Sequence, residues 1–366
     1  MTSWADRFAS LDGVAWLDAA GRGPLPIATV RAAREGLALL ERPQRVAAGY
    51  EAAHAAEARA LAARLFTARE EAVSVVRSAA AAVALFAEAL DLGPGDEVIV
   101  PEGDEAGLGE VWRMAARRGA RLVSVAPAEG AVAVSAERLA GASPPRSRPR
   151  LVAFSQVSAR HGGRIDPPLV VAAARESGAR VIVDASVAAG ALPFDVGACA
   201  VDLYVAAAER HLLGPPGAAL AFFSPAALSL LGAGVGDDVR AARGAAGPLP
   251  GLEPPGLPGL LAVAESVRLL VEVTPAAVQA QSRALCDRLL AALPPGFAPA
   301  SPLDAAQRSH VVCFAAWDRR ATAEAHRRLV DARVQTALVD DRIRVSPHLY
   351  STESDVDRLL AALASE

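Results

Sequence analysis

The chain has 366 residues, 52% of them hydrophobic, and a net charge of −4. Its length and apolar content allow a large core and roughly two globular domains. All 37 basic side chains are arginines, because the sequence contains no lysine, and their scattered positions exclude a basic patch for a nucleic-acid partner. No apolar window approaches roughly 18 residues and no leader pattern is apparent, so we expect a cytoplasmic protein with no membrane segment.

Short β-branched runs alternate with alanine-rich stretches through the first part of the chain. The runs lie at 73–76, 97–100, 122–125, 151–154, 181–184 and 218–223. Strands that are buried on both faces read as continuous apolar runs, and the helices that join them cover the sheet. The pattern therefore predicts an α/β fold with a largely parallel sheet between helices.

A segment rich in proline and glycine interrupts this pattern at 247–259, and a long helix is expected to begin near Leu260. A compact α+β region then continues to the end of the sequence. We therefore expect a large domain at 15–250 and a smaller domain built from 1–14 and 251–366. The three cysteines, Cys199, Cys286 and Cys313, are too few and too widely spaced for a disulfide framework or a metal site, so no metal is expected.

Five segments carry a family resemblance that covers nearly the whole chain. They read WLDAAGRGPLP at 16–26, GDEVIV at 95–100, VDAS at 183–186, DLYVAAAERHLLGPPG at 202–217 and RVSPH at 344–348. Together they resemble the class V aminotransferase and cysteine desulfurase family, in particular its isopenicillin-N-epimerase-like and hercynylcysteine sulfoxide lyase-like branches. The resemblance implies the fold of fold type I pyridoxal phosphate (PLP) enzymes, with a seven-stranded sheet, and a homodimer.

The resemblance places Arg210 where the family has the lysine that forms an imine with PLP. A guanidinium group is always protonated and cannot form this imine, whereas a lysine amine can attack a carbonyl group. The sequence therefore predicts that the usual covalent link to the cofactor cannot form.

The remaining cofactor contacts implied by the family are mostly altered. Asp184 matches the aspartate that pairs with the pyridine nitrogen, although it could equally be a helix cap or an ion-pair partner. Ser78 is the one hydroxyl left in the phosphate-binding turn, and Glu105 falls where a histidine stacks on the ring. Glu209 replaces another histidine and would repel a phosphate. We therefore expect no cofactor, with PLP retained only in one alternative.

Acidic and basic side chains are expected to gather at the mouth of the family's active site. The candidates for acid–base chemistry are His161, His211, Glu105 and Glu209. The candidates for binding a small anionic or amino-acid-like molecule are Arg77, Arg160, Arg164, Arg210 and Arg344. The alternative interpretation is an ion-paired rim around a decayed pocket, with Arg344 holding the domains together. His211 has a second option as a base, as in fold relatives that dehydrate sugars without the lysine.

Three functional hypotheses follow. In the first, a homodimer has lost PLP catalysis and uses the cleft for binding, or for acid–base chemistry, on a small amino-acid-like or anionic metabolite. In the second, the chain is a noncatalytic partner of an active paralogue. In the third, it is a PLP-dependent lyase or transaminase that works without the lysine.

Overall fold

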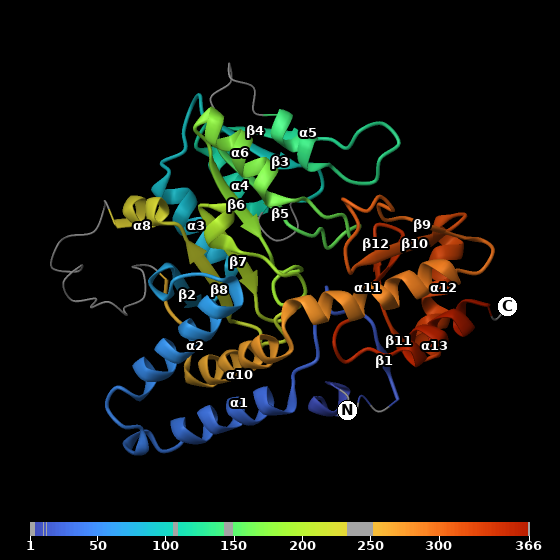
Figure 1. The fold of residues 1–366 in the computed structure, drawn as a ribbon, viewed down its shortest axis with the longest axis horizontal. Coiled ribbons are helices and arrows are strands. Elements are labelled where there is room, and N and C mark those ends of the chain that lie inside the picture. Colours follow the sequence, from blue (N-terminus) through green and yellow to red (C-terminus); the bar gives the residue numbers. More distant parts are fainter. Residues whose placement is uncertain are drawn as a thin grey trace.

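A seven-stranded sheet forms the centre of the molecule in the computed structural model, which describes residues 4–9, 11, 13–104, 109–142, 149–232 and 252–364 (Figure 1). The strand order is β2-β8-β7-β6-β5-β3-β4. Only β8 runs antiparallel to its neighbours. The strands are β2 (Val73–Val76), β3 (Glu97–Pro101), β4 (Arg121–Val125), β5 (Pro149–Ser155), β6 (Arg180–Asp184), β7 (Leu203–Ala207) and β8 (Ala219–Phe223). The predicted α/β fold is confirmed, and β7 is a strand that the six apolar runs did not include.

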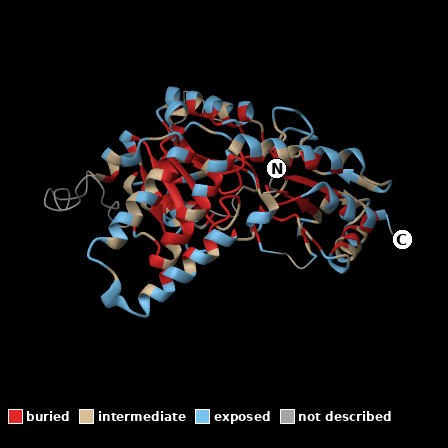
Figure 2. Ribbon diagram, turned by 60° about the horizontal axis from the view of Figure 1, so that its bottom comes forward, coloured by how far each residue is buried: buried red, intermediate tan, exposed pale blue. Residues whose placement is uncertain are grey.

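Both faces of this sheet are buried, because side chains along each strand alternate between two apolar clusters. Val183 belongs to the cluster that α2, α6 and α10 cover, whereas Ile182 belongs to the cluster under α3, α4 and α8. Figure 2 shows the buried sheet between helices whose outer faces are exposed. The helices of this part are α1 (Ile27–Leu40), α2 (Tyr50–Phe66), α3 (Ala79–Ala89), α4 (Gly109–Arg117), α5 (Ala136–Gly141), α6 (Pro167–Ser177), α7 (Val196–Cys199), α8 (Pro225–Gly232) and α10 (Leu257–Val273).

Helix α10 packs against α1 and α2 and covers part of one face of the seven-stranded sheet (Figure 1). A Cβ atom built on Gly36 would lie 2.5 Å from the Cα atom of Pro258, so α1 approaches α10 as closely as only a glycine permits. The helix predicted near Leu260 therefore belongs with the large domain, and the smaller domain begins after it.

The smaller domain contains a four-stranded antiparallel sheet of order β12-β13-β10-β9. Its strands are β9 (Phe297–Pro299), β10 (Val312–Ala316), β12 (Ala337–Val339) and β13 (Arg342–Val345), and its helices are α11 (Pro275–Ala291), α12 (Arg319–Asp331) and α13 (Glu353–Ala364). A separate pair joins β1 (Ala15–Trp16) to β11 (Val334–Gln335). Short 3₁₀ helices lie at η1 (Trp4–Arg7), η2 (Pro43–Arg45) and η3 (Glu70–Ala72). Within the described residues, no helix is both long and apolar enough to span a bilayer.

A segment near the N-terminus connects the two domains through backbone hydrogen bonds. The Ser346 amide donates to the carbonyl oxygen of Leu17 at 2.8 Å, and the Ala19 amide donates to that of Ser346 at 3.0 Å. A few residues later, the Gly23 amide donates to the carbonyl oxygen of Glu209, which follows β7, at 3.0 Å. Residues 17–23 therefore bind the small domain at one end and the large domain at the other.

Candidate active site

The carboxyl ends of β5, β6 and β7 meet at one edge of the large sheet. Ser155, at the end of β5, pairs with Asp184, at the end of β6, and Asp184 pairs with Val205 of β7. In open α/β sheets, ligands bind beyond this edge. The loop after β3 also reaches it, because the carboxylate of Asp104 accepts a hydrogen bond from the Ser155 amide.

Asp184 is held in a fixed orientation at this edge and is only 8% exposed. Its Oδ1 atom accepts hydrogen bonds from the amide of Ser186 at 2.8 Å and from the hydroxyl group of Ser186 at 2.5 Å. Ser186 is fixed in turn, since its hydroxyl oxygen accepts a hydrogen bond from the Ala207 amide at 3.0 Å. No residue in the described part of the chain donates to Oδ2, which leaves this oxygen for a ligand.

Asp104 is a second carboxyl group at the site, and the sequence analysis did not single it out. Although the residue is half-buried as a whole, the burial of its carboxyl group raises its pKa to about 7. Hydrogen bonds from Ser155 lower the pKa by less, and the charge of Asp184 raises it further. Asp104 can therefore gain or lose a proton near neutral pH. The sequence analysis chose its neighbour Glu105, which lies outside the described residues.

The loop that follows β7 is fixed by its backbone. The Leu213 amide donates to the Arg210 carbonyl oxygen at 3.1 Å, and the Gly214 amide donates to that of Ala208 at 2.7 Å. A Cβ atom on Gly23 would lie 2.7 Å from the Arg210 carbonyl oxygen, so residues 17–23 pack tightly over this loop. Glu209 and Arg210 are half-buried here.

The predicted anion-binding arginines differ in their partners. Four of them form ion pairs: Arg77 with Glu253 at 2.7 Å, Arg160 with Asp340 at 2.6 Å, Arg164 with Asp166 at 3.2 Å, and Arg344 with Asp18 at 2.7 Å. Arg344 also donates to the Ala159 carbonyl oxygen at 2.7 Å, so it joins the two domains in this structure. The guanidinium group of Arg210 has no acidic partner among the described residues, and of these five arginines it is the one free to meet an anion.

His211 lies in a buried cluster of imidazole rings between the domains and does not line the cleft. Its ring centroid is 4.6 Å from that of His310 and 5.4 Å from that of His348, and all three residues are fully buried. Burial lowers the pKa of His211 well below its usual value, that of His310 to about 4 and that of His348 to about 3. The buried ring of His211 cannot contact a substrate, so the structure does not support its predicted role in carrying protons.

His161 lies in the loop between β5 and α6 and is half-buried. Its Nδ1 atom accepts a hydrogen bond from the Gly163 amide at 3.0 Å, so the neutral ring carries its proton on Nε2. Burial, followed by the positive charges of Arg342 and Arg160, lowers its pKa to about 4. His161 is therefore neutral at physiological pH and would serve as a proton acceptor only weakly.

Ser78 is the N-cap residue of α3. Its hydroxyl oxygen accepts a hydrogen bond from the Ala81 amide at 3.1 Å, and the first turn of α3 contains no acidic residue. The free amides and the helix dipole at such an end favour a phosphate group. The altered turn that follows β2 therefore keeps the backbone part of an anion site.

Comparisons with known proteins show the family and agree with the fold. The family model for class-V aminotransferases matches residues 15–359. The cysteine desulfurase CsdA from Escherichia coli is 24% identical, with a TM-score of 0.81 over 98% of this chain and 96% of that chain. A variant of C-DES, a cystine C-S lyase, is 21% identical, with a TM-score of 0.81 over 99% of both chains. Alanine–glyoxylate aminotransferase from Nostoc sp. is 18% identical, with a TM-score of 0.77 over 97% of this chain and 95% of that chain. No curated protein sequence matches.

These comparisons contradict the expectation that no cofactor is involved. The C-DES variant has a lysine replaced by alanine, and it contains glycine covalently linked to the PLP cofactor. The family thus indicates PLP, and the expectation of no cofactor, drawn from the missing lysine and the altered ring and phosphate contacts together, was wrong. The family match spans nearly the whole sequence and the fold agrees with it: the chain belongs to the class-V aminotransferase family.

Proposed function

We propose that this protein binds PLP without a covalent bond to its own chain and acts there on a small amino acid, in a lyase- or transaminase-type reaction. The observation that carries the proposal is the buried Asp184, whose Oδ2 atom has no donor among the described residues, in a chain that contains no lysine. A protonated pyridine nitrogen is the donor that such a carboxylate fits. The C-DES variant supports this proposal, since its cofactor is linked to glycine although a lysine is replaced.

The anionic groups of the ligand have two partners in this proposal. The amino end of α3, capped by Ser78, offers backbone amides to the phosphate. Arg210, in the loop after β7, offers a guanidinium group without an acidic partner among the described residues, and it would hold a phosphate or a carboxylate through paired hydrogen bonds. Both contacts lie next to strands that end at the same edge of the sheet as Asp184.

Bound PLP supplies an electron sink for the amino acid that is joined to it. The chain itself must then position protons around the reacting carbon atom. Asp104 is the group suited to this work, because its pKa of about 7 allows it to hold or release a proton near neutral pH. Asp184 offers its Oδ2 atom to the ring nitrogen, and its charge is one cause of the raised pKa of Asp104.

An absorbance titration tests the proposal. PLP is added to the purified protein with and without glycine, and the absorbance is recorded between about 330 and 430 nm. We expect a saturable change in absorbance that is larger with glycine. Asp184→Asn should weaken this binding by about tenfold or more, because a charge-assisted hydrogen bond is lost. The matched control is Arg327→Ala, on the far side of the small domain in α12, which should bind like the wild type. If the wild type gives no saturable change under either condition, the proposal is wrong.

We also propose a homodimer, as the family resemblance implies. The feature that supports it is the exposed apolar surface of α1, where Ile27, Leu37 and Leu40 are 42%, 58% and 51% exposed. Sedimentation equilibrium at micromolar concentration should give twice the monomer mass, and the double variant Leu37→Glu/Leu40→Glu should shift this value toward the monomer if α1 takes part.

A further inference from the structure

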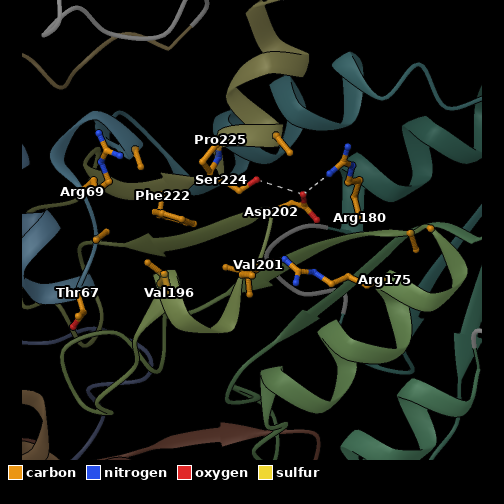
Figure 3. A pocket seen from close by; sticks show the side chains of 17 residues that line it. Thr67, Arg69, Arg175, Arg180, Val196, Val201, Asp202, Phe222, Ser224 and Pro225 are labelled. Carbon is orange, nitrogen blue, oxygen red and sulfur yellow. Dashed lines mark hydrogen bonds and ion pairs between the residues drawn. The ribbon is translucent and has the colours of Figure 1, made fainter.

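A second concave site lies at the opposite edge of the large sheet from Asp184. It is formed where β6 and β7 begin and where the antiparallel β8 ends (Figure 3). The cavity has a volume of about 640 Å³, which is within the usual range for sites that hold small molecules. It shares no residue with the candidate active site.

The walls of this cavity are mainly apolar. Phe222 lies on one side and Val196 and Val201 lie on the other, as Figure 3 shows, with alanines between them. Val196 and Val201 are fully buried, and Phe222 is nearly so. These three side chains therefore form a packed floor, which gives the cavity a stable shape. The partly exposed Ala68, Ala72 and Ala200 supply apolar surface that favours an apolar occupant.

Positive charge is present at the same cavity. Arg175, in the last turn of α6, extends along Val201 (Figure 3), and its Nη2 atom donates only to the Ala200 carbonyl oxygen at 3.3 Å. Within the described part of the chain, no carboxylate forms an ion pair with it. Arg180 lies near it and forms an ion pair with Asp202 at 2.9 Å. Arg69 lies at the exposed rim and forms an ion pair with Glu71 at 3.5 Å.

The one acidic side chain that lines the cavity is already used. The Oδ1 atom of Asp202 accepts from Arg180, and also from the Ser224 hydroxyl group at 3.4 Å. Its Oδ2 atom accepts from the Val181 amide at 2.9 Å. Asp202 thus neutralises Arg180 in part and fixes the start of β6, whereas no described carboxylate is within ion-pair distance of Arg175.

We propose that this cavity is a binding site for a small amphiphilic carboxylate. The apolar chain or ring of the ligand lies against Ala68, Ala72 and Ala200, above the floor that contains Phe222, and its carboxylate accepts hydrogen bonds from Arg175. Arg175 is exposed at the edge of the cavity, and its guanidinium group presents paired donors in the geometry of a carboxylate. The site is independent of the chemistry proposed at the carboxyl edge of the sheet.

Calorimetric titration with three probes tests the site. Decanoate represents an aliphatic carboxylate, 2-naphthoate represents an aromatic one, and decylamine has a similar apolar chain with the opposite charge. We expect at least one carboxylate to bind once per chain and decylamine to bind at least about tenfold more weakly. The carboxylate that binds more tightly identifies the kind of apolar body. Binding of neither carboxylate, or equal binding of decylamine, would overturn the proposal.

Variants show whether binding occurs in this cavity. Arg175→Gln keeps a hydrogen-bond donor but loses the charge, and it should weaken carboxylate binding by about tenfold or more. Arg175→Lys keeps the charge but loses the paired donors, so its affinity should lie between those of Arg175→Gln and the wild type. Ala226→Trp adds a bulky ring at an exposed lining position of α8 and should block either carboxylate. Arg327→Ala removes a distant exposed arginine and should leave binding unchanged. Equal carboxylate affinities in Arg175→Gln and the wild type, with the same melting temperature, would refute the site.

Discussion

The ion pair between Arg344 and Asp18 gives a sharp prediction about stability. The two side chains are 8% and 12% exposed, and the Nη2 atom of Arg344 lies 2.7 Å from Oδ1 of Asp18. Arg344→Met keeps the length of the side chain but leaves a buried carboxylate without its counter-charge. Removing one partner of a buried pair costs about 3–5 kcal/mol, so the free energy of unfolding should fall by roughly this amount.

The matched control is Arg320→Met, which removes the exposed pair that Arg320 forms with Glu324 at 2.9 Å on α12. Exposed pairs of this kind contribute little because water screens them. Urea unfolding, followed by circular dichroism, measures both variants against the wild type. In the double variant Asp18→Asn/Arg344→Met, part of the lost free energy of unfolding should be recovered, since neither charge of the pair is left buried. If Arg344→Met unfolds at the same urea concentration as Arg320→Met, the argument from burial is refuted.

Three further predictions concern the domain junction, a helix contact and the loop after β7. Because His211, His310 and His348 have pKa values below that of an exposed histidine, the unfolded chain binds more protons as the pH falls from about 6.5 toward 4. The free energy of unfolding should therefore be highest above this range and fall within it by about 1.4 kcal/mol per pH unit for each ring. Urea midpoints measured against pH would show this decrease, and His310→Gln should reduce its slope. Gly36→Val should lower stability by about 1–3 kcal/mol because its side chain meets Pro258; an unchanged melting temperature would contradict the close contact. The variant Arg210→Lys should form an adduct with PLP that borohydride fixes at residue 210, whereas the wild type should be modified at no internal residue. Peptide mass spectrometry detects the adduct. Its absence would argue against placing Arg210 at the family's lysine position.

Periodicity identified most of the sheet, because strands that are buried on both faces are apolar throughout. It missed β7, where Leu203, Tyr204 and Val205 lie inside a segment that was interpreted as a motif and not as a strand. Strand pairing places Asp184 at the carboxyl edge, which the position of its apolar run already indicated. The apolar strands and the position of Asp184 at the end of its strand depend on local sequence, so they could be predicted from it.

The electrostatics of the site depend on contacts between distant segments, and the sequence could not supply them. The choice of Glu105 passed over Asp104, whose raised pKa arises from burial beside Ser155 and Asp184. His211 was predicted to carry protons because its segment was expected to line the mouth of the active site. The rings of His310 and His348, more than ninety residues away in the chain, pack against it instead. The expectation of no cofactor failed for a related reason, since it counted altered side chains at the ring and the phosphate and gave too little weight to backbone contacts such as the amides at the start of α3.

The segment at 17–23 has a consequence for how the cleft can change its width. Its backbone bonds to Ser346 on one side and to Glu209 on the other, so the two domains are joined by main-chain atoms next to the site itself. A hinge motion that preserves these bonds must therefore bend the chain between Ala19 and Gly23. The short stretch between the two sets of bonds is thus the place where a relative movement of the two domains would be taken up.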